Sequence, residues 1–249
     1  MSELTTIGID FAASVDKTAI IEMSWEAVPR VLDVVLGADD AAVIDAVVRQ
    51  VPVAVDVPFG WPTAFVDFVA AQRNRTLQAP SRSDVVWRRE TTFRRTDLAM
   101  IDDHGLRPLS VAADRIASAA LRWAVIDARL NAQGVVVRRD GRGPVYEAYP
   151  AASLHKWKLV HRNYKGRHIS DRRQAMLERI SVALGGVDFG RFGPMLARSD
   201  DSFDAFICAL TARAASLGQV WLPASEVDVQ DEGWIVVPSH PIEDLISRT

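Results

Sequence analysis

Two aspartates, Asp10 and Asp56, occur in segments where an unpaired acid is costly. Each lies in a predicted buried strand whose opposite face is apolar, and its own face of the strand carries only small residues. A buried carboxylate requires a cation, a hydrogen-bond network or a metal ion. Both acids lie near the C-terminal ends of their strands, where open α/β sheets bind their ligands. We therefore expect them close together on neighbouring parallel strands, although each could instead cap the loop that follows it.

A second pair of acids, Asp201 and Asp204, lies one turn apart on one face of a predicted helix over residues 201–217. Three small residues continue that face: Ala205, Cys208 and Ala212. A face of small residues can approach a sheet closely, so we expect these acids to face the sheet rather than solvent. The alternative is ordinary stabilisation of a helix N-terminus by acids, which explains Asp200 better than Asp204.

The apolar segment 145–149 carries a further acid, Glu147. Several carboxylates from separate segments that converge on one crevice suit hard, oxygen-preferring cations such as Mg²⁺ or Mn²⁺. The five histidines show no zinc-binding spacing and the chain has one cysteine, so the residues argue against a zinc site. The sequence also lacks the serine motif of a nucleophile elbow and the glycine-rich phosphate loop.

Two basic stretches accompany the acid-bearing strands. The first contains Arg73, Arg75, Arg82, Arg88, Arg89, Arg94 and Arg95. The second contains Lys156, Lys158, Arg162, Lys165, Arg167, Arg172 and Arg173. Trp87 and Trp157 lie among these cations, and a stacking surface for unpaired bases requires aromatic side chains beside cations. A plain solvated surface explains any single one of these cations nearly as well.

The periodicity of apolar residues predicts the elements that must position these side chains. Three antiparallel strands come first, at residues 4–12, 18–25 and 31–36, then a helix over 39–50 and a buried parallel strand over 51–58. Residues 59–143 are expected to hold a helix over 63–73, an irregular arginine-rich segment, and a helix over 111–131 that Ser110 caps. The remainder reads as a strand over 145–149, helices over 151–159, 171–183 and 201–217, a short hairpin with its turn at 231–233, and a last short helix.

These elements indicate one α/β domain over residues 1–249, with an inserted arginine-rich helical segment at about 60–143. The composition, 49% hydrophobic and 24% charged, excludes intrinsic disorder, and the formal net charge of −3 argues neither for nor against nucleic acid. The single cysteine, Cys208, fits a reducing compartment. Because no signal peptide or membrane-spanning run is evident, we expect a cytoplasmic protein that does not bind membranes.

Short motifs, in order along nearly the whole chain, resemble one family. They are Gly8-Ile9-Asp10-Phe11-Ala12, Ala54-Val55-Asp56-Val57-Pro58, Arg94-Arg95-Thr96-Asp97, Glu147-Ala148-Tyr149-Pro150, Tyr164-Lys165-Gly166-Arg167, Asp200-Asp201-Ser202-Phe203-Asp204-Ala205 and Gly233-Trp234-Ile235-Val236-Val237-Pro238. On these motifs the chain is identified as a member of the family numbered 429 among domains of unknown function, described as predicted ribonuclease H-like nucleases. The order of strands and acids resembles the RuvC-type branch of the ribonuclease H-like fold. That fold implies a mixed five-stranded sheet, three antiparallel strands and then parallel strands, flanked by helices.

The resemblance also implies a function and a set of site residues. Its catalytic, metal-binding acids would be Asp10, Asp56, Glu147 and Asp204, with Asp201 as an additional ligand. Two Mg²⁺ or Mn²⁺ ions about 4 Å apart would activate water and stabilise the leaving oxygen of a phosphodiester in DNA or RNA. The substrate-binding residues would be Arg94, Arg95, Lys165 and Arg167, with the first two arginines on phosphate.

Two other functions stay open on the sequence. Gly8-Ile9-Asp10, followed by Ser14 and Lys17-Thr18, also resembles the first phosphate loop of sugar kinases and actin-like ATPases. This resemblance would make the protein an ATP-dependent phosphotransferase or ATPase, although the chain has room for only one of the two such domains that those enzymes use. The third interpretation is a non-catalytic module that binds nucleic acid or protein. ATP turnover without nuclease activity would favour the second function, and binding that persists in chelator would favour the third.

Overall fold

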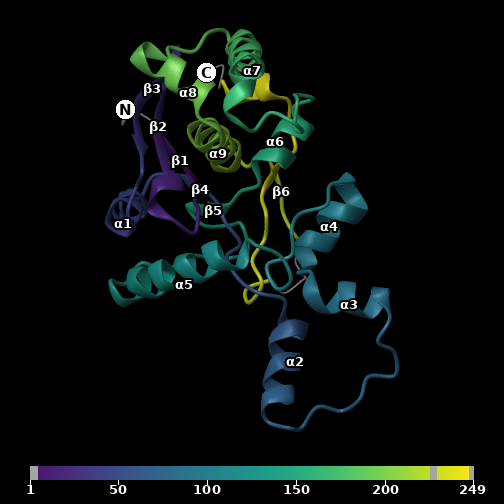
Figure 1. Ribbon diagram of the computed structural model, residues 1–249. Helices are drawn as coiled ribbons and strands as arrows, with labels where there is room; N and C mark the ends of the chain where they lie inside the picture. The colour runs from purple at the N-terminus through teal and green to yellow at the C-terminus, as the bar shows by residue number, and fades with distance from the viewer. Residues whose placement is uncertain (1–4, 225–228, 247–249) are drawn as a thin grey trace.

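A mixed five-stranded sheet forms the centre of the computed structural model, which describes residues 5–224 and 229–246 (Figure 1). Its strands are β1 (Thr5–Asp10), β2 (Ala19–Trp25), β3 (Pro29–Leu36), β4 (Val53–Asp56) and β5 (Val145–Glu147), in the spatial order β3-β2-β1-β4-β5. The first three strands are antiparallel, whereas β4 is parallel to β1 and β5 is parallel to β4. The predicted α/β class and mixed five-stranded sheet are confirmed, and the architecture is consistent with a ribonuclease H-like fold.

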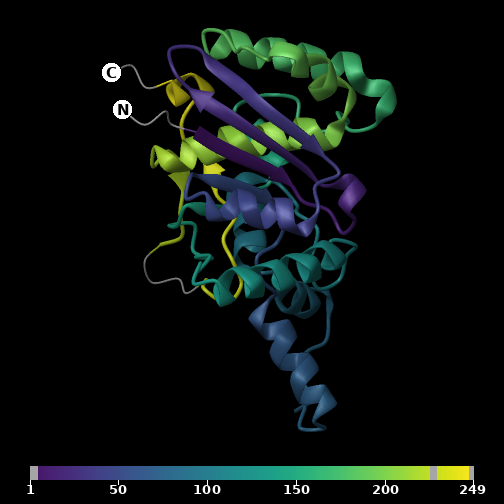
Figure 2. The ribbon, with the colours of Figure 1, turned by 90° about the vertical axis from the view of Figure 1, so that its left-hand side faces the viewer.

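One face of the sheet is covered by α1 (Asp40–Val48) and α5 (Ala117–Ala132) (Figures 1 and 2). The alternation in β1 and β4 directs Ile9 and Val55 to this face, as the sequence predicts. Trp123 of α5 packs in the same layer and is almost fully buried. This layer anchors the two strands whose ends carry Asp10 and Asp56.

The opposite face is covered by α9 (Asp200–Ser216), which packs on β1, β2 and β4. The helices α7 (Ser170–Ala183) and α8 (Gly193–Arg198) pack on the outer side of α9 (Figure 1). Because α9 lies between the sheet and these helices, all its residues from Ser202 to Ala214 are buried. An acid on the sheet-facing side of α9 is therefore held away from bulk water.

Gly8 allows α9 to approach β1 closely. A Cβ atom at residue 8 would lie 2.0 Å from the carbonyl oxygen of Ala205 and 2.2 Å from the amide nitrogen of Ala209, closer than real Cβ atoms come. Farther along the helix, Cys208 and Ala212 pack in one cluster with residues of β4 and β5. The predicted close packing of the small-residue face on the sheet is confirmed.

The segment between β4 and β5 contains three helices before α5: α2 (Thr63–Arg73), α3 (Val85–Thr92) and α4 (Arg95–His104). Figure 1 shows α2 and α3 projecting away from the sheet, and α2 buries none of its residues. The bounds predicted for α2 are confirmed. The expectation of an irregular arginine-rich segment is confirmed for residues 74–84, whereas the residues that follow form α3 and the start of α4.

The start predicted for the helix at 111–131 is also wrong, since α5 begins at Ala117. Ser110 does cap a turn, and its hydroxyl accepts hydrogen bonds from the amides of Ala112 and Ala113. The carboxylate of Asp114 folds back to accept a hydrogen bond from the Ser110 amide. These bonds close a compact turn ahead of α5. The apolar residues of this turn continue the helical spacing of α5, which is why the sequence predicted too early a start for the helix.

The rest of the chain completes the layer around α9. It contains α6 (Pro150–Lys156), β6 (Val220–Trp221), β7 (Val237–Pro238) and four short 3₁₀ turns, at Val15–Lys17, Arg167–Ile169, Gly190–Phe192 and Ile242–Leu245. The predicted tight hairpin is wrong, because β7 pairs antiparallel with the distant β6 rather than across the turn at 231–233. Among the described residues, no helix combines the length and the apolar character needed to cross a bilayer.

Candidate metal centre

The ends of β1 and β4 place two acids side by side. Asp10 is the last residue of β1 and Asp56 the last residue of β4, and the parallel register pairs them directly. Paired residues of neighbouring strands point to the same face of a sheet. Both carboxylates therefore lie on the face that α9 covers, and their predicted proximity is confirmed.

A third acid, Asp204, reaches the same place from α9 and is fully buried. One carboxylate oxygen from each of Asp10, Asp56 and Asp204 lies within 4.8 Å of the other two. We call these three acids the carboxylate cluster. The close packing of α9 at Gly8 is what brings the third acid to the strand ends, since residue 8 is two positions before Asp10 on the same face.

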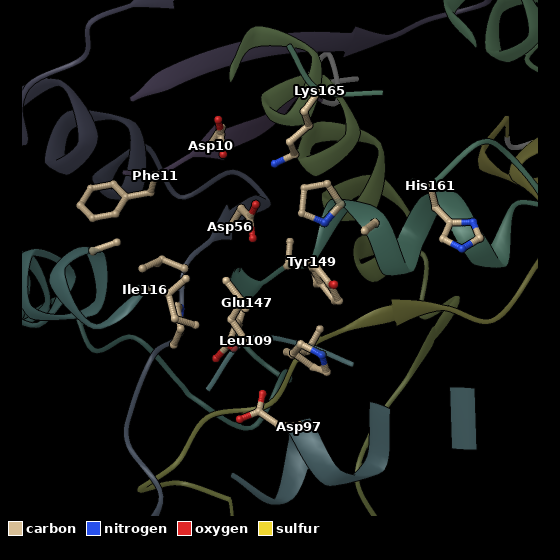
Figure 3. A pocket seen from close by; sticks show the side chains of 18 of the residues that line it. Asp10, Phe11, Asp56, Asp97, Leu109, Ile116, Glu147, Tyr149, His161 and Lys165 are labelled. Atoms are coloured by element: carbon tan, nitrogen blue, oxygen red, sulfur yellow. The ribbon is translucent and has the colours of Figure 1, made fainter. Parts of the chain in front are cut away.

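Two residues that are neighbours in sequence hold Asp204. The Tyr164 hydroxyl donates a hydrogen bond of 2.9 Å to Oδ1 of Asp204. The Lys165 Nζ lies 2.5 Å from Oδ2 in an ion pair. The Lys165 side chain is 57% exposed, and Figure 3 shows its nitrogen directed toward Asp10 and Asp56.

The electrostatics of the cluster show a shortage of positive charge. Burial raises the pKa of Asp56 to about 7. The charge of Lys165 acts in the opposite direction, and the charges of Asp204 and Glu147 partly offset it. Burial, Asp204 and Asp56 raise the pKa of Asp10 well above its usual range. The three acids in turn raise the pKa of Lys165, although burial alone would lower it. One ammonium therefore faces three carboxylates that repel one another.

This donor set fits a metal ion. All its ligand atoms are carboxylate oxygens, which hard divalent cations prefer. The uncompensated negative charge of the three carboxylates is neutralised when a cation binds. The cluster can therefore bind a metal ion, and its charge and oxygen donors distinguish it from the nitrogen and sulfur sites of zinc.

A pocket of about 580 Å³ opens beside the cluster (Figure 3). Asp10 and Asp56 lie on its wall, together with Lys165. Residues before and within α5 line another part, and so do residues around α6, including Tyr149 and His161. A ligand in this pocket would therefore contact the acids directly.

Glu147, a predicted metal ligand, is engaged elsewhere. Its two carboxylate oxygens accept hydrogen bonds of 2.7 and 3.0 Å from the guanidinium of Arg94, and Oε2 also accepts one from the Phe59 amide. Gly233 packs against this carboxylate so closely that a Cβ there would lie 2.6 Å from Oε2. Glu147 lies near Asp56 but outside the carboxylate cluster.

Arg94, a predicted phosphate ligand, is only 2% exposed. It donates two hydrogen bonds to Glu147, two to Asp97 and one to the carbonyl oxygen of Glu232. A guanidinium has five N–H groups, so no donor is left for a substrate phosphate. The sequence expectation for Arg94 therefore does not match the geometry: this arginine joins α4 to β5 and to the segment before β7.

The other predicted residues are dispersed. Asp201 forms an ion pair with Lys17 at 3.6 Å, and its side chain is 25% exposed. Arg95 lies on the surface at the start of α4, and its backbone amide donates to Glu232. Trp157, expected as a stacking surface, is buried in the core around α7 and α9. The side chain of Arg167 lies outside the described part of the structure.

Tyr164 and Arg115 line the same pocket, and neither was expected from the sequence as a functional residue. Tyr164 stands next to Lys165 in the chain, so a motif that places a lysine in the site also places this hydroxyl near it. Arg115 lies in the turn before α5 and lines the pocket. No local sequence pattern indicates that Arg115 reaches the pocket, because its position depends on the turn that Ser110 and Asp114 form.

Comparison with known proteins agrees with the motifs. A family model described as "Protein of unknown function (DUF429)" matches residues 8–237, a range that includes all three acids of the carboxylate cluster. No curated protein and no solved structure gives a significant match. Because the family model matches well over half of the residues of the chain, the chain belongs to the DUF429 family.

Proposed function

We propose that this protein is a hydrolase of phosphodiester bonds in nucleic acid, DNA or RNA, that depends on Mg²⁺ or Mn²⁺. The observation that carries the proposal is the carboxylate cluster, whose three acids come from two adjacent strand ends and one helix, and two of which, Asp10 and Asp56, border a pocket. A cytoplasmic location agrees with the single, buried cysteine.

Asp10, Asp56 and Asp204 would hold the cation. A bound divalent cation lowers the pKa of water and neutralises charge that develops on a phosphoryl group. In the reaction, the oxygen of water forms a bond to phosphorus, the phosphorus–oxygen ester bond breaks, and the departing oxygen takes up a proton. The acids are held for this purpose by their strand ends and by the Tyr164 hydroxyl, which fixes the orientation of Asp204.

Lys165 supplies the movable positive charge of the site. Its ammonium contacts Asp204, but its side chain is more than half exposed, so it can turn toward a substrate in the pocket. With a cation on the acids, the lysine is released from its role as their only counter-charge. It can then donate to a phosphate oxygen, as the sequence resemblance implies.

The test measures metal binding and hydrolysis together. Mn²⁺ titration calorimetry and cleavage of end-labelled single-stranded and duplex DNA and RNA are carried out on the wild type and on Asp10→Asn, Asp56→Asn and Asp204→Asn. We expect each variant to lose Mn²⁺ binding by at least about tenfold and to lose cleavage by about 10² or more. Asp201→Asn is the matched control, because it changes an acid one turn away that lies outside the cluster.

Three outcomes would contradict the proposal. Equal losses in Asp201→Asn and Asp204→Asn would show that the effect is not specific to the cluster. ATP turnover by a wild type that cleaves no polynucleotide would favour a phosphotransferase. Nucleic-acid binding that persists in chelator, without cleavage in Mg²⁺ or Mn²⁺, would favour a non-catalytic binding module.

A further inference from the structure

The pocket beside the carboxylate cluster is small. Its volume of about 580 Å³ lies within the range of roughly 300–1,000 Å³ that is typical of small-molecule sites. A cube of this volume measures about 8 Å on an edge, whereas the major groove of B-DNA alone is about 12 Å wide. A continuous duplex therefore does not enter the pocket, but one nucleotide does.

The pocket offers apolar surface beside the acids. Leu109 and Ile116, from the turn and the residue that precede α5, line it, and Leu109 is 41% exposed although it is a large apolar side chain. In Figure 3, Phe11 and Ile116 lie on one side of Asp10 and Asp56, and His161 lies on the other. The half-buried Tyr149 adds an aromatic side chain. Apolar and aromatic groups of this kind bind the flat face of an unpaired base.

Arg115 supplies an uncommitted cation at the same pocket. It is exposed, and it forms no hydrogen bond or ion pair with any described residue. Arg94, the other arginine that lines the pocket, has all its donors occupied. A free guanidinium is suited to bidentate contact with phosphate, so Arg115 fits the phosphate-binding role that the sequence analysis assigned to Arg94.

We propose that this pocket binds one unpaired nucleotide, with its base against Leu109, Ile116 and Tyr149 and its phosphate between Arg115 and the carboxylate cluster. The inference rests on the proposed function, because an anion approaches three carboxylates only when a cation is bound to them. The nucleotide belongs to a strand end or to an unpaired stretch within a strand, and these two sources share the same chemistry.

The first experiment measures binding alone. Calorimetry in Mn²⁺ compares adenosine 5′-monophosphate and cytidine 5′-monophosphate with inorganic phosphate. We expect both nucleotides to bind at least about tenfold more tightly than phosphate, since only they contact the apolar wall. Leu109→Trp fills the pocket and weakens nucleotide binding by about tenfold or more, while Leu121→Trp, at a 60% exposed position of α5 that does not line the pocket, leaves it unchanged.

A second pair of variants tests the phosphate contact. Arg115→Ala weakens the binding of nucleotides and of phosphate alike, whereas Arg179→Ala, at an exposed position of α7 away from the pocket, changes neither. Mn²⁺ binding by the protein alone is measured in every variant, so that loss of the metal centre is recognised separately. Phosphate that binds as tightly as the nucleotides, or Leu109→Trp that binds them normally, would overturn the inference.

The final arm separates the sources of the nucleotide and the two proposals. The substrates are linear single strands, circular single strands and blunt duplexes of one sequence, each with Mn²⁺. We expect the linear single strand, alone or together with the circular one, to react about 100-fold faster than the duplex. Cleavage of linear but not circular strands identifies a strand end, and cleavage of both identifies an internal unpaired stretch. Duplex cleaved as fast as single strands would reject the pocket inference and keep the hydrolase. Nucleotide binding with the expected variant pattern, but no cleavage, would support the pocket and reject the hydrolase.

Discussion

Asp56 is the residue whose protonation most directly reports on the metal centre. Its pKa is about 7 in the folded protein and near its ordinary value of 3.8 in the unfolded chain. Between these two values the folded state binds more protons, so the free energy of unfolding falls as pH rises from about 4 to about 7 and levels off above it. Denaturant unfolding in chelator, at several pH values, should show this decline, and Asp56→Asn should reduce it.

Two further measurements make this prediction specific. Asp33→Asn, an exposed change on β3, should keep the wild-type pH dependence. Saturating Mg²⁺ should restore stability above pH 7 in the wild type and not in Asp56→Asn, because a ligand stabilises only the state that binds it. The prediction would be wrong if, in chelator, the stability of the wild type rose between pH 4 and 7 and that of Asp56→Asn did not. That result would mean that the folded protein stabilises the Asp56 carboxylate without a metal ion.

For single residues, the sequence predicted the acids of the carboxylate cluster correctly where a charged residue stood in an apolar segment. Asp10, Asp56 and Asp204 each stand among apolar or small neighbours, and the structure brings all three together. Glu147 stands in an equally apolar strand, but Arg94 satisfies it from 53 positions away. The spacing of acids along the chain contains no information about which buried acid meets an arginine and which meets other acids.

Gly8 determines how two elements, β1 and α9, fit together. A methyl group at residue 8 would overlap the backbone of α9, and backbone cannot move aside as a side chain can. Gly8→Ala should therefore destabilise the protein by about 1–3 kcal/mol or more and should weaken Mn²⁺ binding, because α9 carries Asp204. Thermal unfolding and Mn²⁺ titration measure the two effects.

The matched control is Gly193→Ala. Gly193 has helical backbone angles, φ −49° and ψ −49°, and a Cβ there would make an ordinary contact at 3.4 Å from Phe189. This change should be neutral or slightly stabilising. If Gly8→Ala behaved like Gly193→Ala in both measurements, the close approach of α9 would not limit the metal centre.

Elements that pack in the core were predictable from their apolar spacing, whereas α3 was not. The strands β1 to β5 and the helices α1 and α9 show apolar positions at strand or helix spacing, because the core selects them. In α3 the pattern is absent: Val85 is 70% exposed, Val86 is 51% exposed, and the buried residue is Thr91. A helix whose apolar residues face solvent cannot be recognised from hydrophobic periodicity.

For the molecule as a whole, α2 and α3 form an arm that the metal centre does not need. Figures 1 and 2 show the arm extending from the body, and residues 74–84 between its helices are exposed. Trypsin should therefore cut first after Arg73, Arg75 or Arg82. The nicked protein should keep its Mn²⁺-dependent rise in Tm, because β1, β4 and α9 supply the acids.

Mass spectrometry of the early fragments and thermal unfolding of the nicked protein test this expectation. The same digestion of Asp204→Asn serves as a control, since it should yield the same first cuts without a metal effect. The expectation would be wrong if the first cuts fell within α9 or the sheet. It would also be wrong if the nicked wild type lost its Mn²⁺-dependent rise in Tm, since the arm would then support the rest of the protein.

The position of the third acid also sets when during synthesis the centre can exist. A ribosome releases Asp10 and Asp56 before the long insertion between β4 and β5, and it releases Asp204 only after that insertion. Contacts between such distant segments form slowly, because the entropy of closing a long loop is lost before the contacts contribute any stability. The nascent chain therefore carries two acids without the third until α9 has been made, and the carboxylate cluster is complete only when α9 docks on β1. If the protein is the hydrolase that we propose, it stays inactive until α9 has been made.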